Sequence, residues 1–517
     1  MPFTATLVEL RNMWAPKELL TFVCGSFILY WAIQSLWRLH FHPLSRFPGP
    51  RIAAVSDIWL AYHSLSGRWP WVVENALKKY GDVVRVAPNE LVFCTPQAVT
   101  DIYGSHEKFL ERFPKTQINN HGNDEHGGLI WEWDPVRHRQ VAKQLSPAFS
   151  GRALKAKEPT IHKYVDLFVE RMETLGSGSD GQGVSLPTWI NWICVDISAD
   201  MAYNREMNSL KDMKDAPYLS LLMRLHRAIV LIQVSWRFPL ISPLKYLYLV
   251  PMMMGHSHIR EHSRQQLERR IRRQGAVEHL DFIEQLIPED REPPKGKELR
   301  HLEQVAGQLL IAGYEPPSLW FYFTIYHLVQ NRNALDILTK EIRDAFETYD
   351  GITAGAAANL PYLTCCLKES LRFTPPLLTG MPVVSPGATV DGTYVPRGVV
   401  CQSSLLTLAR SPRNFHEPLQ FRPERWITAD DKHPLFDPKF ANDNRAGFQP
   451  FSQGPRICAG KEIAWWQIRV FIAKVLWKFD LEVVPGSIGA EGIDGVLRGW
   501  AMYEKPEVRV KFLPVRL

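Results

Sequence analysis

The sequence has little of several features that mark common classes of protein. Its seven cysteines are odd in number and scattered, so they predict no disulfide framework and favour a reducing compartment. A net charge of only +6 over 517 residues argues against nucleic acid as the main partner. The mean hydropathy of −0.17 excludes an architecture built from several membrane spans. These absences leave a mainly soluble body with, at most, local attachment to a membrane.

The chain does have enough apolar sequence to bury a large core. Hydrophobic residues make up 45% of it and charged residues 22%, which is typical of a globular protein. No linker after residue 50 separates autonomous halves, and no internal repeat is visible. We therefore expect one large domain over residues 51–517.

The strongest apolar run lies near the N-terminus. Residues 19–37 contain no charge and would span about 28 Å as a helix, enough to cross most of a bilayer core. A cleaved secretory signal is the alternative, but no small-residue cleavage pattern ends the run. We expect a short flank at residues 1–18, a transmembrane anchor at 19–37 and a stiff, proline-rich hinge at 38–50.

Charges around this run predict its orientation. Three arginines, Arg38, Arg46 and Arg51, follow the run, whereas Arg11 and Lys17 precede it. Basic residues favour the cytosolic side of a membrane, so the bias places the large domain in the cytosol.

The body reads as mainly helical with a small part rich in strands. Apolar residues at 83–86 and 91–93 flank a turn and predict a hairpin, and turn signals predict a second hairpin at 389–400. The segments 301–330 and 463–477 are apolar on nearly all sides, which is typical of helices that run through a core.

One cysteine stands in a context that suggests chemistry. Cys458 lies in a glycine-rich turn before a long apolar helix, where the helix N-terminus and Arg456 should both favour the thiolate. A nucleophile would need a nearby histidine, and a zinc site would need more cysteines or histidines at short spacing. Neither occurs locally, so a single soft axial ligand to a haem iron fits better.

The segment around this cysteine resembles the signature F-x-x-G-x-R-x-C-x-G of the cytochrome P450 family at every fixed position. The resemblance implies that Cys458 is the thiolate ligand of a haem b (iron protoporphyrin IX), that Phe451 shields the sulfur and that Arg456 holds a haem propionate. It also implies the fold of that family, mainly α with a small β-rich lobe. The N-terminal part of the body is similar to filamentous-fungal members that act in natural-product pathways.

A second motif supports the resemblance. Glu369 and Arg372 stand three residues apart on one face of a predicted helix, which alone is usually surface decoration. Together with Arg425 they resemble the E-x-x-R and P-E-R-F motifs of the family. The resemblance implies a network with a structural role on the cysteine side of the haem.

The pattern breaks in the helix predicted over the iron. Most family members carry an acid followed by alcohols there, whereas this chain reads Ala312, Gly313, Tyr314, Glu315 and then two prolines. The acid Glu315 therefore remains and is the candidate catalytic residue. The alcohol positions are Pro316 and Pro317, and a proline within a helix costs roughly 3 kcal/mol and removes a backbone hydrogen bond.

These prolines leave two hypotheses open. In the first, the prolines only enlarge the substrate pocket, to which Ala312, Gly313, Pro316 and Pro317 are candidates to contribute, and protons pass through Glu315, water or substrate. Alternatively, the enzyme has lost efficient oxygen activation and catalyses a rearrangement, a dehydration or a peroxide-driven reaction. A kink above the iron is expected, and Ser318 replaces the lost hydroxyl only if that kink rotates it back.

Two positions that usually contribute arginines to the propionates also differ. Ala142 and Val383 stand where arginine is common in relatives. The resemblance therefore assigns haem binding to Arg456 and His138, with Lys143 as a further candidate.

The expected activity is that of a membrane-anchored monooxygenase that oxidises a lipophilic small molecule in fungal secondary metabolism. No nucleotide-binding fingerprint occurs in the chain, so electrons from NADPH should arrive through a separate NADPH–cytochrome P450 reductase that docks near Lys461 and Arg139. The single-pass anchor suggests the endoplasmic reticulum, with the catalytic domain facing the cytosol. A non-enzymatic haem-binding protein is the remote alternative.

Overall fold

A computed structural model of the chain describes most of its residues. These are residues 16–116, 128–178, 181–216, 219–240, 242–247, 264–273, 281–283, 286–287, 292, 294–487, 492–500 and 502–515.

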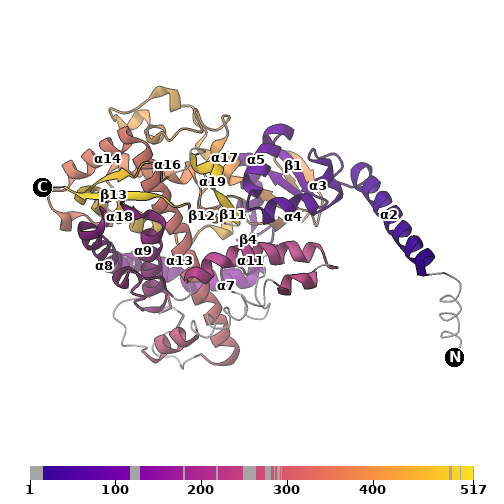
Figure 1. Cartoon of the computed structure of the whole chain (residues 1–517), viewed down its shortest axis with the longest axis horizontal. Helices are drawn as coiled ribbons and strands as arrows, with labels where there is room; N and C mark the ends of the chain where they lie inside the picture. Colours follow the sequence, from indigo (N-terminus) through magenta and orange to yellow (C-terminus); the bar gives the residue numbers. More distant parts are fainter. Residues whose placement is uncertain are drawn as a thin grey trace.

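Helices make up most of the described chain, and three of them exceed twenty residues (Figure 1). In chain order their bounds are α2 Pro16–His40, α3 Arg51–Val55, α4 Ile58–Leu65, α5 Trp69–Tyr80, α6 Pro96–Val99, α7 Pro135–Leu145, α8 Gly151–Leu175, α9 Leu186–Tyr203, α10 Ser209–Asp212, α11 Leu219–Arg237, α13 Gly296–Gln330, α14 Arg332–Ala345, α15 Ala354–Ala357, α16 Pro361–Phe373, α17 Leu405–Arg410, α18 Lys461–Lys478 and α19 Gly492–Val496.

The strands form small sheets at the edges of the helical body. The largest sheet has the order β1-β2-β9-β6, and a second has the order β10-β13-β5. The strand bounds are β1 Val83–Ala87, β2 Glu90–Phe93, β3 His106–Glu107, β4 Leu110–Glu111, β5 Val184–Ser185, β6 Val383–Val384, β7 Ala388–Val390, β8 Thr393–Val395, β9 Val400–Ser403, β10 Phe479–Val483, β11 Arg498–Trp500, β12 Met502–Glu504 and β13 Arg509–Pro514.

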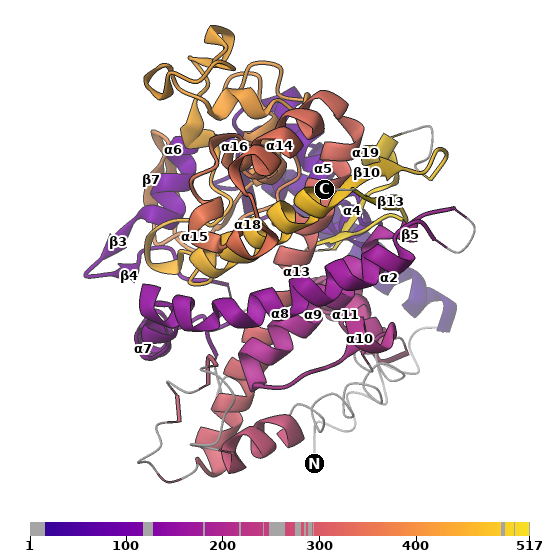
Figure 2. The same ribbon diagram turned by 90° about the vertical axis from the view of Figure 1, so that its left-hand side faces the viewer.

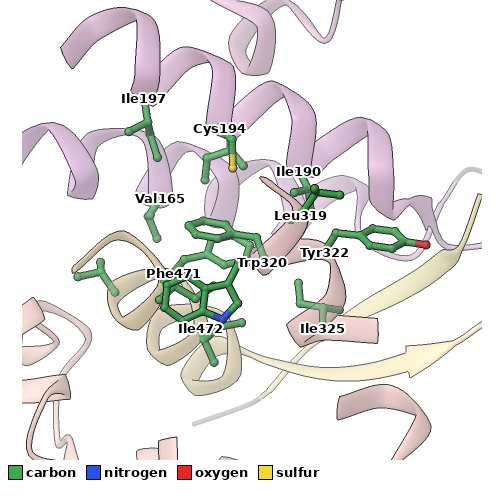
Figure 3. Close-up of a cluster of buried hydrophobic side chains, with 14 of the residues drawn as sticks. Val165, Ile190, Cys194, Ile197, Leu319, Trp320, Tyr322, Ile325, Phe471 and Ile472 are labelled. Carbon is green, nitrogen blue, oxygen red and sulfur yellow. The ribbon is translucent and has the colours of Figure 1, made fainter. Parts of the chain in front are cut away.

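The main core lies where α13 and α18 meet α8 and α9 (Figures 2 and 3). Phe321 of α13 and Phe471 of α18 are fully buried, and their rings stack with centroids 4.5 Å apart. Burying an aromatic or aliphatic side chain of this size contributes roughly 1.5–3 kcal/mol. Because α13 is apolar on nearly all sides, this packing holds it in the middle of the molecule, where it carries Glu315.

Helix α13 continues through both prolines. It runs unbroken from Gly296 to Gln330, and α9 is hydrogen-bonded to it at two residues that precede the prolines. Ser198 donates a hydrogen bond to the Leu310 carbonyl at 2.7 Å, and the Tyr314 hydroxyl donates one to Asn191 at 3.1 Å. Tertiary contacts thus offset the local cost of Pro316 and Pro317, which do not end the helix.

The first predicted hairpin is confirmed and the second is only partly correct. Strands β1 and β2 pair antiparallel, as the sequence indicated. In the second segment β7 and β8 form the hairpin across Asp391 and Gly392, but β9 leaves it and pairs in parallel with β2. The sequence gives no signal for this parallel pairing, because its partners lie some three hundred residues apart.

Helix α2 contains the predicted anchor. It is longer than the expected segment, its described side chains are mostly exposed, and in Figure 1 it extends away from the body. Residues 17–40 are long and apolar enough to cross a membrane, which is weak support for an anchor by itself.

Candidate functional site

The cysteine lies in a tight loop between a 3₁₀ turn, Gly454–Arg456, and helix α18. The Cys458 N–H donates a hydrogen bond to the Phe451 carbonyl at 2.9 Å, which closes the loop. Gly454 has a φ of +69°, and a Cβ there would collide with the backbone of Tyr103. Glycine is therefore required at this position of the motif by conformation and by space.

The Cys458 thiol is accessible although protein atoms surround it on most sides. Its residue is exposed, yet burial raises the pKa of the thiol, which is the combination expected of a group that lines an interior surface. The Gly460 backbone N–H and the charge of Lys461 act in the opposite direction and lower that pKa. Arg456, which we expected to favour the thiolate, is not among the groups that lower this pKa, because its guanidinium binds other groups.

Arg456 is the centre of a buried cluster of cations. Its Nε donates to Glu111 at 2.7 Å and its Nη1 donates to the Glu132 carbonyl at 2.7 Å. Burial, followed by the charge of Arg456, lowers the pKa of Lys115 to about 7. Burial and the charges of Arg456 and Lys115 lower the pKa of His138 to about 3. Glu111 and Glu132 oppose the shift of Lys115, so the cluster combines buried cations with two carboxylates.

Unpartnered donors lie beside this cluster. The Trp133 indole nitrogen and the Thr116 hydroxyl are buried and have no hydrogen-bond partner among the described residues. Trp133 follows Glu132, whose carbonyl accepts from Arg456, and Thr116 follows Lys115, so both are next in the chain to members of the cluster. Buried donors are normally satisfied, and carboxylates such as haem propionates are strong acceptors. The cluster thus fits the acidic edge of a haem, with Cys458 as the iron ligand.

The sequence missed Lys115 as a member of this cluster. It pointed instead to Lys143, which is exposed near the end of α7. His138 of α7 is buried and close enough to Arg456 and Lys115 for their charges to lower its pKa, whereas Ala142 contributes no charge. Lys115 is placed by an isolated bridge to Val383, a pairing that no local pattern in the sequence reveals.

The predicted acid on α13 has a partner from another helix. His226 of α11 lies with its Nε2 at 2.9 Å from Oε2 of Glu315. Three residues further along α13, Ser318 donates its hydroxyl to the backbone carbonyl of Glu315 at 2.8 Å. Burial lowers the pKa of Lys505 to about 8, with the charge of Glu315 opposing that shift. His226 and Lys505 were not identified from the sequence.

The pocket candidates lie on the same turns of α13. Ala312 is exposed and Gly313 half-buried, whereas Pro317 and Glu315 are buried in the helix packing. An accessible residue near the middle of a core helix is consistent with a surface that a bound group would cover.

The three structural candidates meet in the core. Arg372 donates through Nε and Nη2 to the two oxygens of Glu369, at 2.9 and 2.7 Å. Arg425 reaches Glu369 at 3.0 Å and Asp443 at 2.5 Å. Their charges hold the pKa of Glu369 below its ordinary value although burial raises it. Glu369, Arg372 and Arg425 therefore form an ionised network with no exposed side chain.

The model of the cytochrome P450 family matches residues 52–491. The chain belongs to the cytochrome P450 family. It is 71% identical over 500 residues to cytochrome P450 monooxygenase TwmD of Talaromyces wortmannii, covering 96% of each chain. It is 34% identical to cytochrome P450 monooxygenase poxC of Penicillium oxalicum, covering 95% and 94%. Trichothecene C-4 hydroxylase of Trichoderma arundinaceum is 30% identical, over 88% and 90%.

The protein is thus a P450 monooxygenase of the type found in fungal secondary metabolism. Membership in the P450 family implies a haem iron held by a cysteine thiolate, a small-molecule substrate and a redox partner. These relatives give no support to the alternative of a non-enzymatic haem protein.

Proposed function

We propose that this P450 is a membrane-anchored monooxygenase that oxidises a lipophilic small molecule with electrons from NADPH, delivered by a separate reductase. The observation that carries the proposal is the accessible thiol of Cys458 in a loop flanked by the buried cations of Arg456 and Lys115. A haem b placed there would supply the chemistry of oxygen activation.

Five groups would hold the haem. Cys458 would bind the iron, and Phe451, whose carbonyl fixes the cysteine loop, would cover the sulfur. Arg456 and Lys115 would pair with the propionates, and the buried donor of Trp133 would complete their hydrogen bonding.

In the proposed reaction, Glu315 would transfer protons, and α13 would form part of the substrate pocket. Accessible backbone at Ala312 and Gly313 leaves room for substrate, while Pro316 and Pro317 add rigid apolar surface. Because the helix continues through the prolines, Glu315 keeps a fixed direction from a rigid element. This favours the monooxygenase over a reaction that needs no oxygen.

Membrane attachment would involve more than α2. Exposed apolar side chains gather on α4 and near the end of α11, which pack against each other. They are Ile58, Tyr62, Leu65, Trp236 and Leu240. A patch of this kind marks a membrane or protein contact. We place the protein at the endoplasmic reticulum with its catalytic domain in the cytosol, where a reductase would meet the exposed basic residues Lys461 and Arg139.

Spectroscopy and turnover test this function. The reduced, carbon monoxide-bound protein should show the absorption of a thiolate-ligated haem, and Cys458→Ala should abolish it. Product formation should require both NADPH and oxygen, and product formed without either would establish the oxygen-independent alternative. Comparing metabolites of a host with and without the chain would identify the accumulated precursor and hence the substrate.

A further inference from the structure

Glu315 is held by a titratable side chain that comes from a different helix. The Nε2 of His226 on α11 and Oε2 of Glu315 on α13 are 2.9 Å apart, and the two side chains are only 14% and 11% exposed. A hydrogen bond between an imidazole and a carboxylate is stronger than one between neutral groups. The contact therefore holds the Glu315 carboxylate in one direction as long as α11 is packed against the rest of the protein.

No hydroxyl of the neighbouring turn is free to act instead. Pro316 and Pro317 carry none, and the Ser318 hydroxyl is fully buried and donates to the backbone carbonyl of Glu315. The nearest side chain that can both accept and release a proton next to the carboxylate is thus the imidazole of His226.

The position of His226 is itself fixed. The next residue, Arg227, pairs with Glu504 and lies over the Trp500 ring at 4.4 Å from its centroid. At the far end of α11, Arg237 pairs with Asp57 at 2.7 Å and with Glu90. The contacts of Arg227 and Arg237 hold α11 against the rest of the protein, next to His226 and at the C-terminal end of the helix.

We propose that His226 positions the Glu315 carboxylate and resupplies it with protons, in place of the hydroxyl that the two prolines exclude. After Glu315 releases its proton toward the pocket, the Nε2 proton of a protonated His226 moves to Oε2 of Glu315. The imidazole becomes neutral and regains a proton from solvent. Imidazole suits this role because one ring nitrogen can donate a proton while the other accepts one. The proposal rests on the monooxygenase function.

Other charged groups lie near the pair. Lys505, after β12, interacts with Glu315, whose charge opposes the lowering of the Lys505 pKa by burial to about 8. Arg227, the next residue along α11, pairs with Glu504, so these two charges largely neutralise each other.

The test compares three variants of the full-length chain reconstituted with a reductase. His226→Gln keeps a hydrogen-bond donor but cannot titrate, and His226→Phe removes both properties. Arg227→Gln is the matched control, because it breaks the neighbouring ion pair of α11 and leaves the contact with Glu315. NADPH consumption and peroxide release are measured from pH 5.5 to 8, without added substrate. The carbon monoxide spectrum checks haem loading.

We expect His226→Phe to slow NADPH consumption at least about tenfold. His226→Gln should flatten the pH profile, whereas Arg227→Gln should retain the profile of the wild type. A wild-type profile in His226→Gln, or an equal flattening in Arg227→Gln, would overturn the proposal. If the wild type itself lacks the thiolate spectrum or consumes no NADPH, the monooxygenase function fails instead.

A second measurement does not depend on turnover. His226→Phe, Glu315→Gln and the double variant form a cycle in which thermal unfolding is measured. The two changes should be less than additive, because each breaks the same contact. Strict additivity would show that the pair is not formed and would overturn the proposal even if the protein binds no haem.

Discussion

Two clusters of polar side chains differ in burial and in construction. Glu369, Arg372 and Arg425 are fully buried, and both oxygens of the carboxylate are bound. The side chains of His226 and Glu315 are 14% and 11% exposed and make a single contact between two helices. The first cluster therefore has only one stable arrangement, whereas the second can be made and broken at modest cost.

The difference suggests a division of labour. In the proposed function, groups on the cysteine side would hold the loop that binds iron and would gain from rigidity. Groups on α11 and α13 would exchange protons and admit substrate, so they would gain from access to solvent. The following experiments test this contrast, beginning with the largest expected effect.

Arg372→Ala should be the most damaging change. It removes two of the five hydrogen bonds to the buried Glu369 carboxylate and should lower the free energy of unfolding by about 3–5 kcal/mol. Chemical denaturation and haem content after purification measure the effect. The control is Lys340→Ala, which breaks an exposed ion pair with Asp344 and should change stability little. Equal losses of stability in Arg372→Ala and Lys340→Ala would contradict the distinction between the buried network and a partly or fully exposed ion pair.

Lys115→Met should weaken haem retention. Loss of a buried charge-assisted hydrogen bond is worth about 1.5–3 kcal/mol, so the haem should leave roughly ten- to a hundredfold faster. Transfer of haem to an apo-globin measures this rate. Lys143→Met, on the exposed end of α7, should leave it unchanged. Faster haem loss in Lys143→Met than in Lys115→Met would instead support the role that the sequence assigned to Lys143.

His327→Gln should reduce the acid sensitivity of the core beside the first cluster. Burial, followed by the charge of Arg410, lowers the pKa of His327 to about 3. Between about pH 6.5, the ordinary pKa of histidine in an unfolded chain, and about pH 3, only the unfolded chain binds a proton at this residue. The free energy of unfolding therefore falls by up to about 1.4 kcal/mol for each pH unit of acidification over this range. Glutamine can still bond Thr374 and does not titrate.

Unfolding at pH 7.5 and 5.5 compares the two proteins. The wild type should lose more stability between these values than His327→Gln, and equal losses would show that this histidine is not buried in its neutral form.

Pro316→Thr should have the smallest effect. A hydroxyl next to Glu315 adds a second route for protons, so peroxide released per NADPH should fall a few-fold at most. Pro317→Ala, which restores a backbone N–H but adds no hydroxyl, is the control. Unchanged or greater leakage in Pro316→Thr would argue against a proton-relay role for this turn.

Much of the site could be predicted because its motifs are local. The spacing of Glu369 and Arg372 requires only a helix, and the cysteine loop requires only glycine at a strained turn. The course of β9 could not be predicted, because parallel pairing with β2 depends on the packing of the whole sheet. The continuity of α13 through its prolines likewise depends on contacts from α9.

The sequence by itself determined the cysteine loop, the acid on the long helix and the pair of Glu369 and Arg372, because each is encoded by residues close together or by spacing on one helix. Only the tertiary structure decided that His226 faces Glu315 and that Lys115 lies beside Arg456. Those partners come from elements far apart in the chain. Helix packing, rather than any local pattern, brings them within reach of one another.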